Sequence, residues 1–293
     1  MANAIDYLVS NPAARIVFRT LRPLVHAARR LKNPEIPNDQ TVMRVSYGYK
    51  TFDIRHRRWN TADTDAIRQC FEQKQYDMPS GEHGAFIQRF YDEIVASGHQ
   101  PLIVDCGANI GASILWFHAR YPRAHIVGIE PAPGNFQLLQ SNCAGLDVDL
   151  RQVGIGAEDS TAFLNDTGSD AAYRIGITET DQSVEIVSVA TVLDSKPASL
   201  YVPFLLKLDI EGSEKTLFAG DRSAINRFPL IILEPHDWMF PGERCTAEFF
   251  RFHAAAGREF SMHNENVASI AYSQSFSDSD SAQTAAAGMN KAG

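Results

Sequence analysis

A glycine-rich turn follows the first strongly apolar run of the chain, and its residue types suit a small cationic ligand. The run LIVDC contains Asp105 near its end, and the turn that follows includes Gly107, Ala108, Asn109 and Gly111. In doubly wound sheets the first strand-to-helix turn presents backbone N–H groups to a ligand. The pyrophosphate of a dinucleotide approaches the backbone at a second glycine of such a turn. This chain has Asn109 at that point, and the Asn109 side chain keeps a pyrophosphate away from the backbone. The acid ahead of the turn would repel phosphate but attract an amine or a sulfonium.

A second acid, Glu130, ends the next apolar run, HIVGIE. A carboxylate at this point of such a fold accepts hydrogen bonds from ribose hydroxyls. The predicted ligand therefore has a ribose and a cationic group but no pyrophosphate, as S-adenosylmethionine does. Pro131 and Asn135, which follow Glu130, are expected to contact its adenosine part. The simpler alternative is that Asp105 and Glu130 only cap helices and that the glycines serve tight packing.

Two later strand ends carry charged residues two positions apart, which places them on one face of each strand. LLKLDIEG contains Lys207, Asp209 and Glu211, and PLIILEPH contains Glu234 and His236. Methyl transfer from a sulfonium requires that the acceptor atom be held in line with the methyl group and, where the acceptor is a hydroxyl, that it lose its proton. We assign this catalysis to Asp209, His236, Lys207 and Glu211. Asp209 is expected nearest the methionine amine or the acceptor oxygen, and His236 is expected to act as general base.

The same strand ends leave a metal-assisted alternative open. A divalent cation held by some of Asp209, Glu211, Glu234 and His236 would lower the pKa of the hydroxyl. The oxygen-rich donor set would suit Mg²⁺ better than zinc, although no residue is assigned as a metal ligand. Glu214 lies in the first turn of the next predicted helix, where its charge favours the helix dipole.

Strands and helices alternate around these residues, which predicts an α/β fold with a doubly wound, mostly parallel sheet of the Rossmann type. The predicted strands are 102–106, 125–130, 148–156, 204–210 and 229–234. The predicted helices are 112–122, 134–145, 213–220 and 245–257. Short antiparallel strands or edge pieces are expected at 161–166, 171–178 and 184–194. Ahead of the sheet, the patterns predict short helices at 4–31, a β-hairpin at 42–56 and a helix at 61–73.

Composition excludes several classes of protein. The chain of 293 residues has no stretch of about 18 uncharged apolar residues, which argues against a spanning helix. Its four cysteines are far apart and form no C-x-x-C pair, which argues against a zinc ribbon or a disulfide scaffold. The first residues do not form a secretory signal, so a cytoplasmic protein is expected.

Charge and composition divide the chain into three predicted parts. Residues 1–85 are expected to form a helical and hairpin cap, 86–272 the S-adenosylmethionine-binding domain and 273–293 a disordered tail. Residues 1–60 carry eleven Lys and Arg against four Asp and Glu, although the whole chain carries a net charge of −8. Such a basic segment leaves peripheral membrane contact through the N-terminal helices open, and it also fits solvated helix faces. The acidic body argues against a nucleic-acid partner, and the oligomeric state is not predicted.

These stretches resemble the FkbM family of S-adenosylmethionine-dependent O-methyltransferases over roughly residues 50–260. The resemblance rests on 55–77, 102–142, 205–220 and 229–236, and its most specific part is the K-x-D-x-E-G-x-E block at 207–214. It implies a class I methyltransferase fold and methyl transfer to a hydroxyl of a sugar or another polyhydroxylated acceptor, in glycan or natural-product biosynthesis. Two alternatives stay open: a catalytically silent scaffold of the same fold that binds a partner, and a nucleotide-sugar-binding oxidoreductase or epimerase.

Overall fold

The structure, a computed structural model, describes residues 36–78, 81–166, 173–176 and 183–272. The described residues up to Thr41 and those from Val42 onward belong to two separate compact units, and all that follows concerns the second, apart from Gln40 and Thr41, which begin a strand. The predicted helices at 4–31 and the predicted tail at 273–293 lie outside the described residues. Among the helices that are described, none has the length and apolar character needed to cross a membrane.

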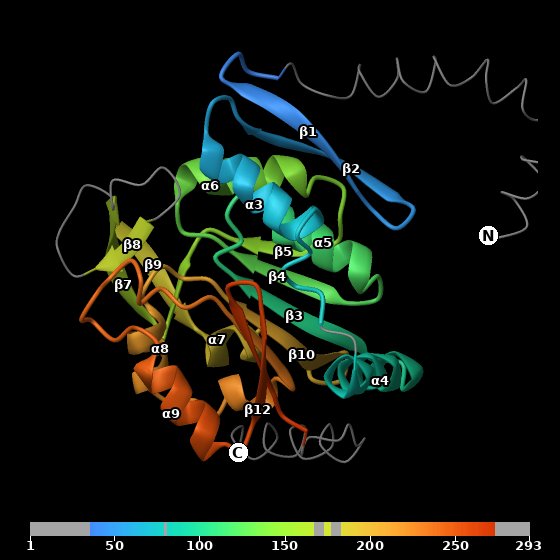
Figure 1. Cartoon of the computed structure of the whole chain (residues 1–293), viewed down its shortest axis with the longest axis vertical. Helices are drawn as coiled ribbons and strands as arrows, with labels where there is room; N and C mark the ends of the chain where they lie inside the picture. The colour runs from blue at the N-terminus through green and yellow to red at the C-terminus, as the bar shows by residue number, and fades with distance from the viewer. Residues whose placement is uncertain (1–35, 79–80, 167–172, 177–182, 273–293) are drawn as a thin grey trace, which may run out of the picture. The chain divides into compact units, whose positions relative to one another are not determined.

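A seven-stranded sheet forms the centre of this unit, in the order β12-β13-β11-β10-β3-β4-β5 (Figure 1). Its strands are β3 (Gln100–Cys106), β4 (His125–Ile129), β5 (Val148–Arg151), β10 (Tyr201–Leu208), β11 (Leu230–Leu233), β12 (Glu259–His263) and β13 (Asn266–Ile270). Strands β5, β4, β3, β10 and β11 pair in parallel, whereas β13 is antiparallel to both β11 and β12. The predicted α/β class with a doubly wound, mostly parallel sheet is confirmed.

The order of the strands reverses between β3 and β10. The chain proceeds from β3 to β4 and β5 on one side of the sheet, and it then crosses to β10 and β11 on the other. At this reversal the register places Lys207 beside Asp105 and Leu208 beside Cys106. Open sheets of this kind bind ligands at such a reversal, outside the carboxyl ends of the strands.

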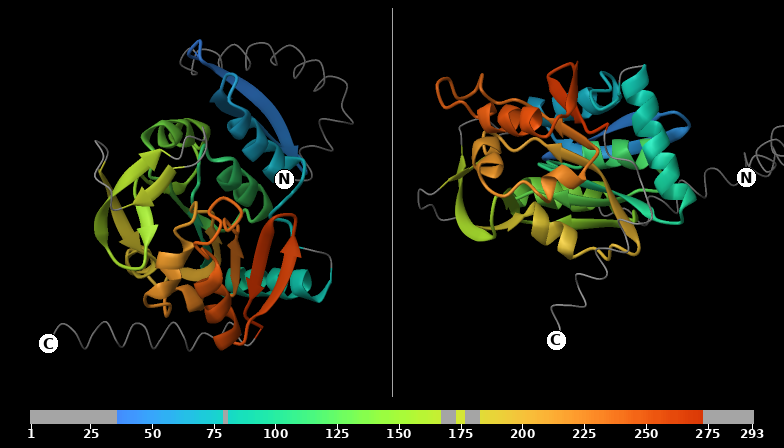
Figure 2. Two further views of the ribbon diagram at one scale, coloured as in Figure 1. Left: turned by 60° about the vertical axis from the view of Figure 1, so that its left-hand side comes forward. Right: turned by 90° about the horizontal axis from the view of Figure 1, so that it is seen from below.

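Helices cover both faces of the sheet (Figure 2). One layer contains α4 (Glu82–Ala96), α5 (Ala112–Arg120) and α6 (Pro133–Asn142), and the other contains α7 (Val189–Asp194), α8 (Glu214–Ala219), the 3₁₀ helix η1 (Ile225–Arg227) and α9 (Ala247–Ala255). Successive strand residues face opposite layers, so Ile103 packs in the first core and its neighbours Leu102 and Val104 pack in the second.

The segment before the sheet forms the hairpin and helix that the sequence predicts. Strands β1 (Gln40–Tyr47) and β2 (Lys50–Arg57) enclose a turn at Gly48, whose φ of 57° suits glycine. Helix α3 (Thr61–Phe71) begins after Asn60, whose side chain accepts a hydrogen bond from the Asp63 N–H. Helix α3 packs on α5, and β2 packs on α5 and α6. The segment is therefore fixed beside the helices that follow β3 and β4.

A second, four-stranded sheet lies between β5 and α7 in the chain, in the order β6-β9-β7-β8. Its strands are β6 (Gly154–Gly156), β7 (Ser160–Asp166), β8 (Tyr173–Gly176) and β9 (Ser183–Ser188). The pairs β7–β8 and β7–β9 are antiparallel, as expected, whereas β6 and β9 pair in parallel.

Four stretches differ from the sequence-based expectation. The strand predicted at 148–156 is divided, because the chain leaves the main sheet after β5 and β6 joins the smaller sheet. The strand predicted at 184–194 ends at Ser188, whose side chain caps α7 by accepting the Thr191 N–H. Helix α4 and the hairpin of β12 and β13 were not predicted, although they complete one layer and one edge of the main sheet.

Candidate functional site

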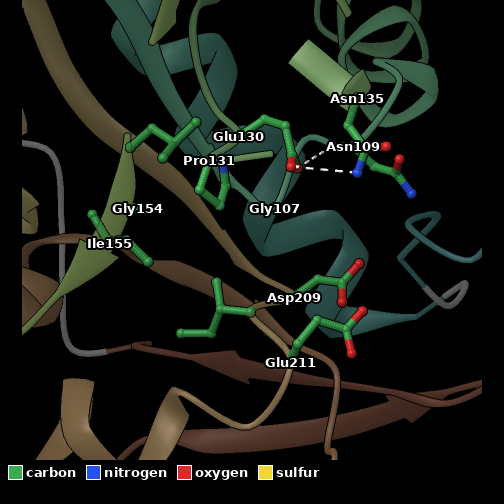
Figure 3. A pocket seen from close by; sticks show the side chains of 11 residues that line it. Gly107, Asn109, Glu130, Pro131, Asn135, Gly154, Ile155, Asp209 and Glu211 are labelled. Atoms are coloured by element: carbon green, nitrogen blue, oxygen red, sulfur yellow. Dashed lines mark hydrogen bonds between the residues drawn. The ribbon is translucent and has the colours of Figure 1, made fainter. Parts of the chain in front are cut away.

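A cavity lies at the carboxyl ends of β3, β4 and β10, with about 540 Å³ of empty space that includes its opening to solvent. Its lining residues are Gly107, Asn109, Ile129, Glu130, Pro131, Asn135, Gly154, Ile155, Asp209, Ile210 and Glu211. Figure 3 shows Glu130 and Pro131 at one end of this cavity and Asp209 and Glu211 at the other. The structure thus brings together predicted residues from three strand ends. The sequence pattern does not indicate Gly154 and Ile155, because it predicts only a continuous strand at 148–156.

The turn after β3 requires its glycines. Gly107 has a φ of 81°, and a Cβ there would lie 1.8 Å from the backbone oxygen of Asp209. Gly111 has a φ of 92°, and Asn109 between them is also left-handed at 48°. Only Gly107 and Asn109 of this turn line the cavity, whereas Ala108 and Gly111 are buried behind it. The turn therefore lets the backbones of β3 and β10 approach each other where a ligand would lie.

Glu130 is held at the edge of the cavity by neutral donors. Its Oε2 accepts the Asn109 N–H at 2.9 Å, and its Oε1 accepts the Ala132 N–H at 2.9 Å and the Asn135 amide at 3.4 Å. The side chain is buried, and this burial raises the pKa of Glu130 to about 7 although the three donors lower it. Oε2 accepts only one of these hydrogen bonds, so its second lone pair can still accept a ligand hydroxyl.

Asn135 connects this carboxylate to the hairpin segment. Its Oδ1 accepts a hydrogen bond from Arg57 Nη2 at 3.0 Å, and the Arg57 guanidinium also pairs with the fully buried Asp63. Arg57 and Asp63 were not predicted to serve the site. They lie far from Asn135 in the sequence, and a surface-type arginine beside a helix N-terminus gives no local signal of such a contact.

Asp105, predicted to contact the cofactor, does not line the cavity. Its Oδ2 accepts the Ser113 hydroxyl at 2.6 Å, and its Oδ1 lies 3.0 Å from Lys207 Nζ. Lys207 is also buried, donates to the Gly107 carbonyl at 2.7 Å and lies 3.4 Å from Asp209 Oδ2. Burial opposes the ammonium charge, but Asp105 and its neighbours raise the pKa of Lys207 well above its usual value. Asp105 thus acts through Lys207, which fixes both the glycine turn and Asp209.

His236 is surrounded by carboxylates. Its Nδ1 lies 2.6 Å from Glu214 Oε1, and its Nε2 lies 3.5 Å from Asp209, 3.7 Å from Glu211 and 3.9 Å from Glu234. Burial favours the neutral imidazole, but Asp209 and Glu214 raise the pKa of His236 to about 11. A doubly protonated imidazole has no free lone pair. Its predicted role as a general base therefore requires that its Nε2 proton first be displaced.

The acids of this group differ in their ionisation. Burial and the charge of Asp209 raise the pKa of Glu211 to about 7, and they also raise that of Glu234. Burial acts in the same direction on Asp209, but Lys207 and His236 outweigh it and lower its pKa. Donor atoms of Asp209, Glu234 and His236 all lie within 4.8 Å of one another, which makes these residues a candidate metal-binding group.

Fold and family agree on the class of this protein. A mostly parallel seven-stranded sheet with one reversed strand, β13, and a cavity at the carboxyl ends of β3 and β4 is the class I methyltransferase architecture that the resemblance implied. The chain belongs to the FkbM methyltransferase family, whose domain matches residues 105–265.

Two curated relatives are methyltransferases by name. The chain is 28% identical to Methyltransferase 1 of Beauveria bassiana (strain ARSEF 2860), over 46% of this chain and 64% of that protein. It is 30% identical to methyltransferase sdnD of Sordaria araneosa, over 46% of this chain and 65% of that protein. The match thus spans slightly less than two thirds of the length of these relatives.

Solved structures with a similar chain path have low sequence identity. A putative O-methyltransferase from Klebsiella pneumoniae has a TM-score of 0.36 at 12% identity, covering 70% of this chain and 89% of that chain. A putative caffeoyl-CoA O-methyltransferase from Staphylococcus aureus has a TM-score of 0.37 at 9% identity, covering 71% of this chain and 91% of that chain. Similarity at this level gives no information about the substrate of this chain.

Proposed function

We propose that this chain binds S-adenosylmethionine in the cavity and transfers its methyl group to a hydroxyl of an acceptor. The observation that carries the proposal is the division of one cavity between two different carboxylates. Glu130 lies at one end among neutral hydrogen-bond donors, and Asp209 lies at the other beside Lys207 and His236. These ends suit the ribose hydroxyls and the cationic methionine part of one ligand.

The remaining lining residues fit the same ligand. Ile129, Pro131 and Ile155 provide an apolar wall of the kind that an adenine ring contacts. Asn109 Oδ1 is buried at the cavity and has no hydrogen-bond partner within the described part of the chain. A buried acceptor without a donor is unfavourable, so a ligand N–H or O–H at this point would be stabilising. Asn109 carries a side chain where the pyrophosphate of a dinucleotide would need bare backbone, which disfavours a dinucleotide.

When bound, S-adenosylmethionine supplies a methyl group on a sulfonium, which makes the methyl carbon electrophilic. The chain must then hold the acceptor oxygen about 3 Å from that carbon and remove the proton of the hydroxyl. The side chains of Asp209 and Glu211 are 27% and 24% exposed, so an acceptor can reach them. We place the acceptor hydroxyl beside these two carboxylates and His236, and Lys207 holds Asp209 in position.

A sugar or another polyhydroxylated molecule is the acceptor class that this end of the cavity favours. Carboxylates accept hydrogen bonds from hydroxyls, and two of them here are accessible. Trp238, two residues after His236, is 73% exposed but does not itself line the cavity, and we place its aromatic face against the apolar side of an acceptor ring. Both features suit a small hydroxylated ring better than a flat apolar acceptor.

Transfer of a ¹³C-labelled methyl group tests this proposal. The purified chain would be incubated with labelled S-adenosylmethionine and a panel of sugars, glycosides and polyols, with amines as comparison. The chemical shift of the product methyl distinguishes O-methyl from N-methyl groups. We expect O-methyl products that are lost in Asp209→Asn and retained in the surface control Asp221→Asn. Cofactor binding without turnover on any acceptor would favour a silent scaffold, and an N-methyl product would contradict the O-methyl assignment.

A further inference from the structure

We propose that Asp209, Glu234 and His236 bind a divalent cation, that Glu211 lies at the edge of this site, and that Glu214 is its positioning residue. The inference rests on the proposed function, because the site lies at the acceptor end of the same cavity. Asp209 follows β10, and Glu234 and His236 follow the neighbouring strand β11, so two adjacent strand ends supply the three ligands.

The spacing of the donor atoms suits an ion between them. His236 Nε2 lies 3.5 Å from Asp209 Oδ1 and 3.9 Å from Glu234 Oε1, which exceeds the usual 2.7–3.2 Å of a hydrogen bond. Two ligands that each lie about 2.1 Å from one cation are roughly 3.0–3.5 Å apart at octahedral to tetrahedral angles. The observed separations are therefore close to those of ligands that share an ion.

The orientation of His236 is an independent indication of a ligand. The side chain is 2% exposed, and its Nδ1 meets Oε1 of the fully buried Glu214 at 2.6 Å. Its Nε2 consequently points toward the oxygens of Asp209, Glu211 and Glu234. A histidine that binds a metal nearly always donates its other ring N–H to a carboxylate or carbonyl, which fixes the ring and its tautomer. In this chain, Glu214 is the carboxylate in that position.

Charge also favours a cation. Asp209, Glu211, Glu214 and Glu234 surround one imidazole, and the nearby Lys207 is shared with Asp105. Even a doubly protonated His236 leaves this group negative. Glu211 Oε2 is buried and has no hydrogen-bond partner among the described residues. A divalent ion would neutralise charge that is costly to bury.

The donor set indicates the class of ion and its use. One imidazole nitrogen with carboxylate oxygens suits a first-row ion such as Mn²⁺ better than Mg²⁺, which prefers oxygen alone. Asp209 lines the cavity, so the side of the site away from His236 faces the space that receives the acceptor. A hydroxyl bound there would have a lowered pKa, which makes loss of its proton to a neighbouring carboxylate easier.

Pulsed electron paramagnetic resonance with Mn²⁺ tests the site directly. The full chain would first be freed of metal with a chelator and then titrated with Mn²⁺. We expect one bound ion per chain with a ¹⁴N coupling from His236. The coupling should disappear in His236→Gln, and the affinity should fall at least ~10-fold in Glu234→Gln and in Glu214→Gln. Absence of bound Mn²⁺ in the unaltered chain, or binding without a nitrogen coupling, would overturn the proposal.

A matched acid nearby serves as the control. Glu265 lies close enough to feel the charge of Asp209 but is hydrogen-bonded to Gln69, outside the ligand group. Glu265→Gln should bind Mn²⁺ within about twofold of the unaltered chain, and an equal loss there would mean diffuse attraction rather than a site. Calorimetry with S-adenosylhomocysteine on every variant checks folding. Retained S-adenosylhomocysteine binding without Mn²⁺ binding would contradict only the cation site, whereas loss of both in the unaltered chain would contradict the proposed function.

Discussion

The two ends of the cavity hold their carboxylates in different ways. Glu130 is surrounded by backbone N–H groups and an amide, whereas Asp209 is paired with the charged Lys207 and His236. Neutral donors only partly compensate for burial, so the pKa of Glu130 rises to about 7. The charges of Lys207 and His236 outweigh the effect of burial on Asp209, so the pKa of Asp209 lies below its usual value.

The difference shows which part of the site is local and which part depends on distant contacts. The Glu130 end is built by two turns, after β3 and β4, whose own backbone atoms make the hydrogen bonds. The Asp209 end exists only when β3, β10 and β11 are aligned, because Asp105, Lys207 and His236 come from separate strand ends. Substitutions should therefore act mainly on ligand binding at the first end and mainly on stability at the second.

Replacement of Lys207 should have the largest effect. Lys207→Met removes the partner of Asp105, which is fully buried, and leaves an uncompensated charge in the core. We expect the free energy of unfolding to fall by about 3–5 kcal/mol in urea titrations. The exposed control Lys215→Met should change it by less than about 0.5 kcal/mol. A loss of under 1 kcal/mol in Lys207→Met would mean that charge pairing does not organise this end.

Gly107→Ala should have the second-largest effect. The new Cβ would meet the Asp209 carbonyl at 1.8 Å, and the φ of 81° is itself unfavourable for alanine. Strain of this kind costs about 1–3 kcal/mol before any shift of β10, and we expect S-adenosylhomocysteine binding to be lost as well. Gly134→Ala is the matched control, because its Cβ would enter open space. Unchanged binding in Gly107→Ala would show that the turn does not define the ligand site.

The stability contributed by Glu130 should depend on pH. Its pKa rises from about 4.5 to about 7 on folding, so the folded chain holds a proton that the unfolded chain has lost. This stabilisation is full below pH ~4.5 and is lost as the pH rises through ~7. The groups that face Glu130 are the Asn109 and Ala132 N–H groups, the Asn135 amide and, at longer range, Lys207.

Urea unfolding of the unaltered chain and of Glu130→Gln at pH 4.5 and pH 8 measures this dependence. Relative to the variant, the unaltered chain should lose roughly 2–3 kcal/mol over that range. An equal pH response of both chains would show that Glu130 has an ordinary pKa.

Glu130→Gln should also weaken ligand binding. The glutamine oxygen can accept only one of the two backbone N–H groups, which bond separate oxygens of Glu130, and the charge-assisted hydrogen bonds to ribose hydroxyls are lost. We expect the Kd for S-adenosylhomocysteine at pH 8 to rise about tenfold, from a loss of roughly 1.5 kcal/mol. Asp105→Asn should instead lower stability, because Asp105 does not line the cavity. A larger affinity loss in Asp105→Asn would reverse this assignment.

The smallest effect is expected for Arg57→Lys. A lysine cannot reproduce the forked contact with Asp63 and Asn135, so Asn135 should orient Glu130 less well. We expect the Kd for S-adenosylhomocysteine to rise only two- to fourfold, with little change in melting temperature. The exposed pair of Arg44 with Asp53 offers the control Arg44→Lys, which should leave the Kd unchanged.

The contrast also explains what the sequence could predict. Gly107, Gly111 and Glu130 act through the local backbone, so their spacing alone predicts the turn that the structure shows, and Glu130 stays the predicted ribose-binding acid. The roles of Asp105 and Glu214 could not be predicted, because their partners Lys207 and His236 come from other elements. Local pattern likewise missed α7, whose start depends on the Ser188 cap, and the hairpin of β12 and β13, whose buried residues only the completed sheet explains.

Isothermal titration calorimetry of the purified chain with S-adenosylhomocysteine, with NAD in parallel, tests the central claim most directly. The account predicts micromolar binding of S-adenosylhomocysteine that weakens about tenfold in Glu130→Gln, and no binding of NAD. No binding of S-adenosylhomocysteine, or tighter binding of NAD, would contradict the assignment of this cavity to a methyl donor.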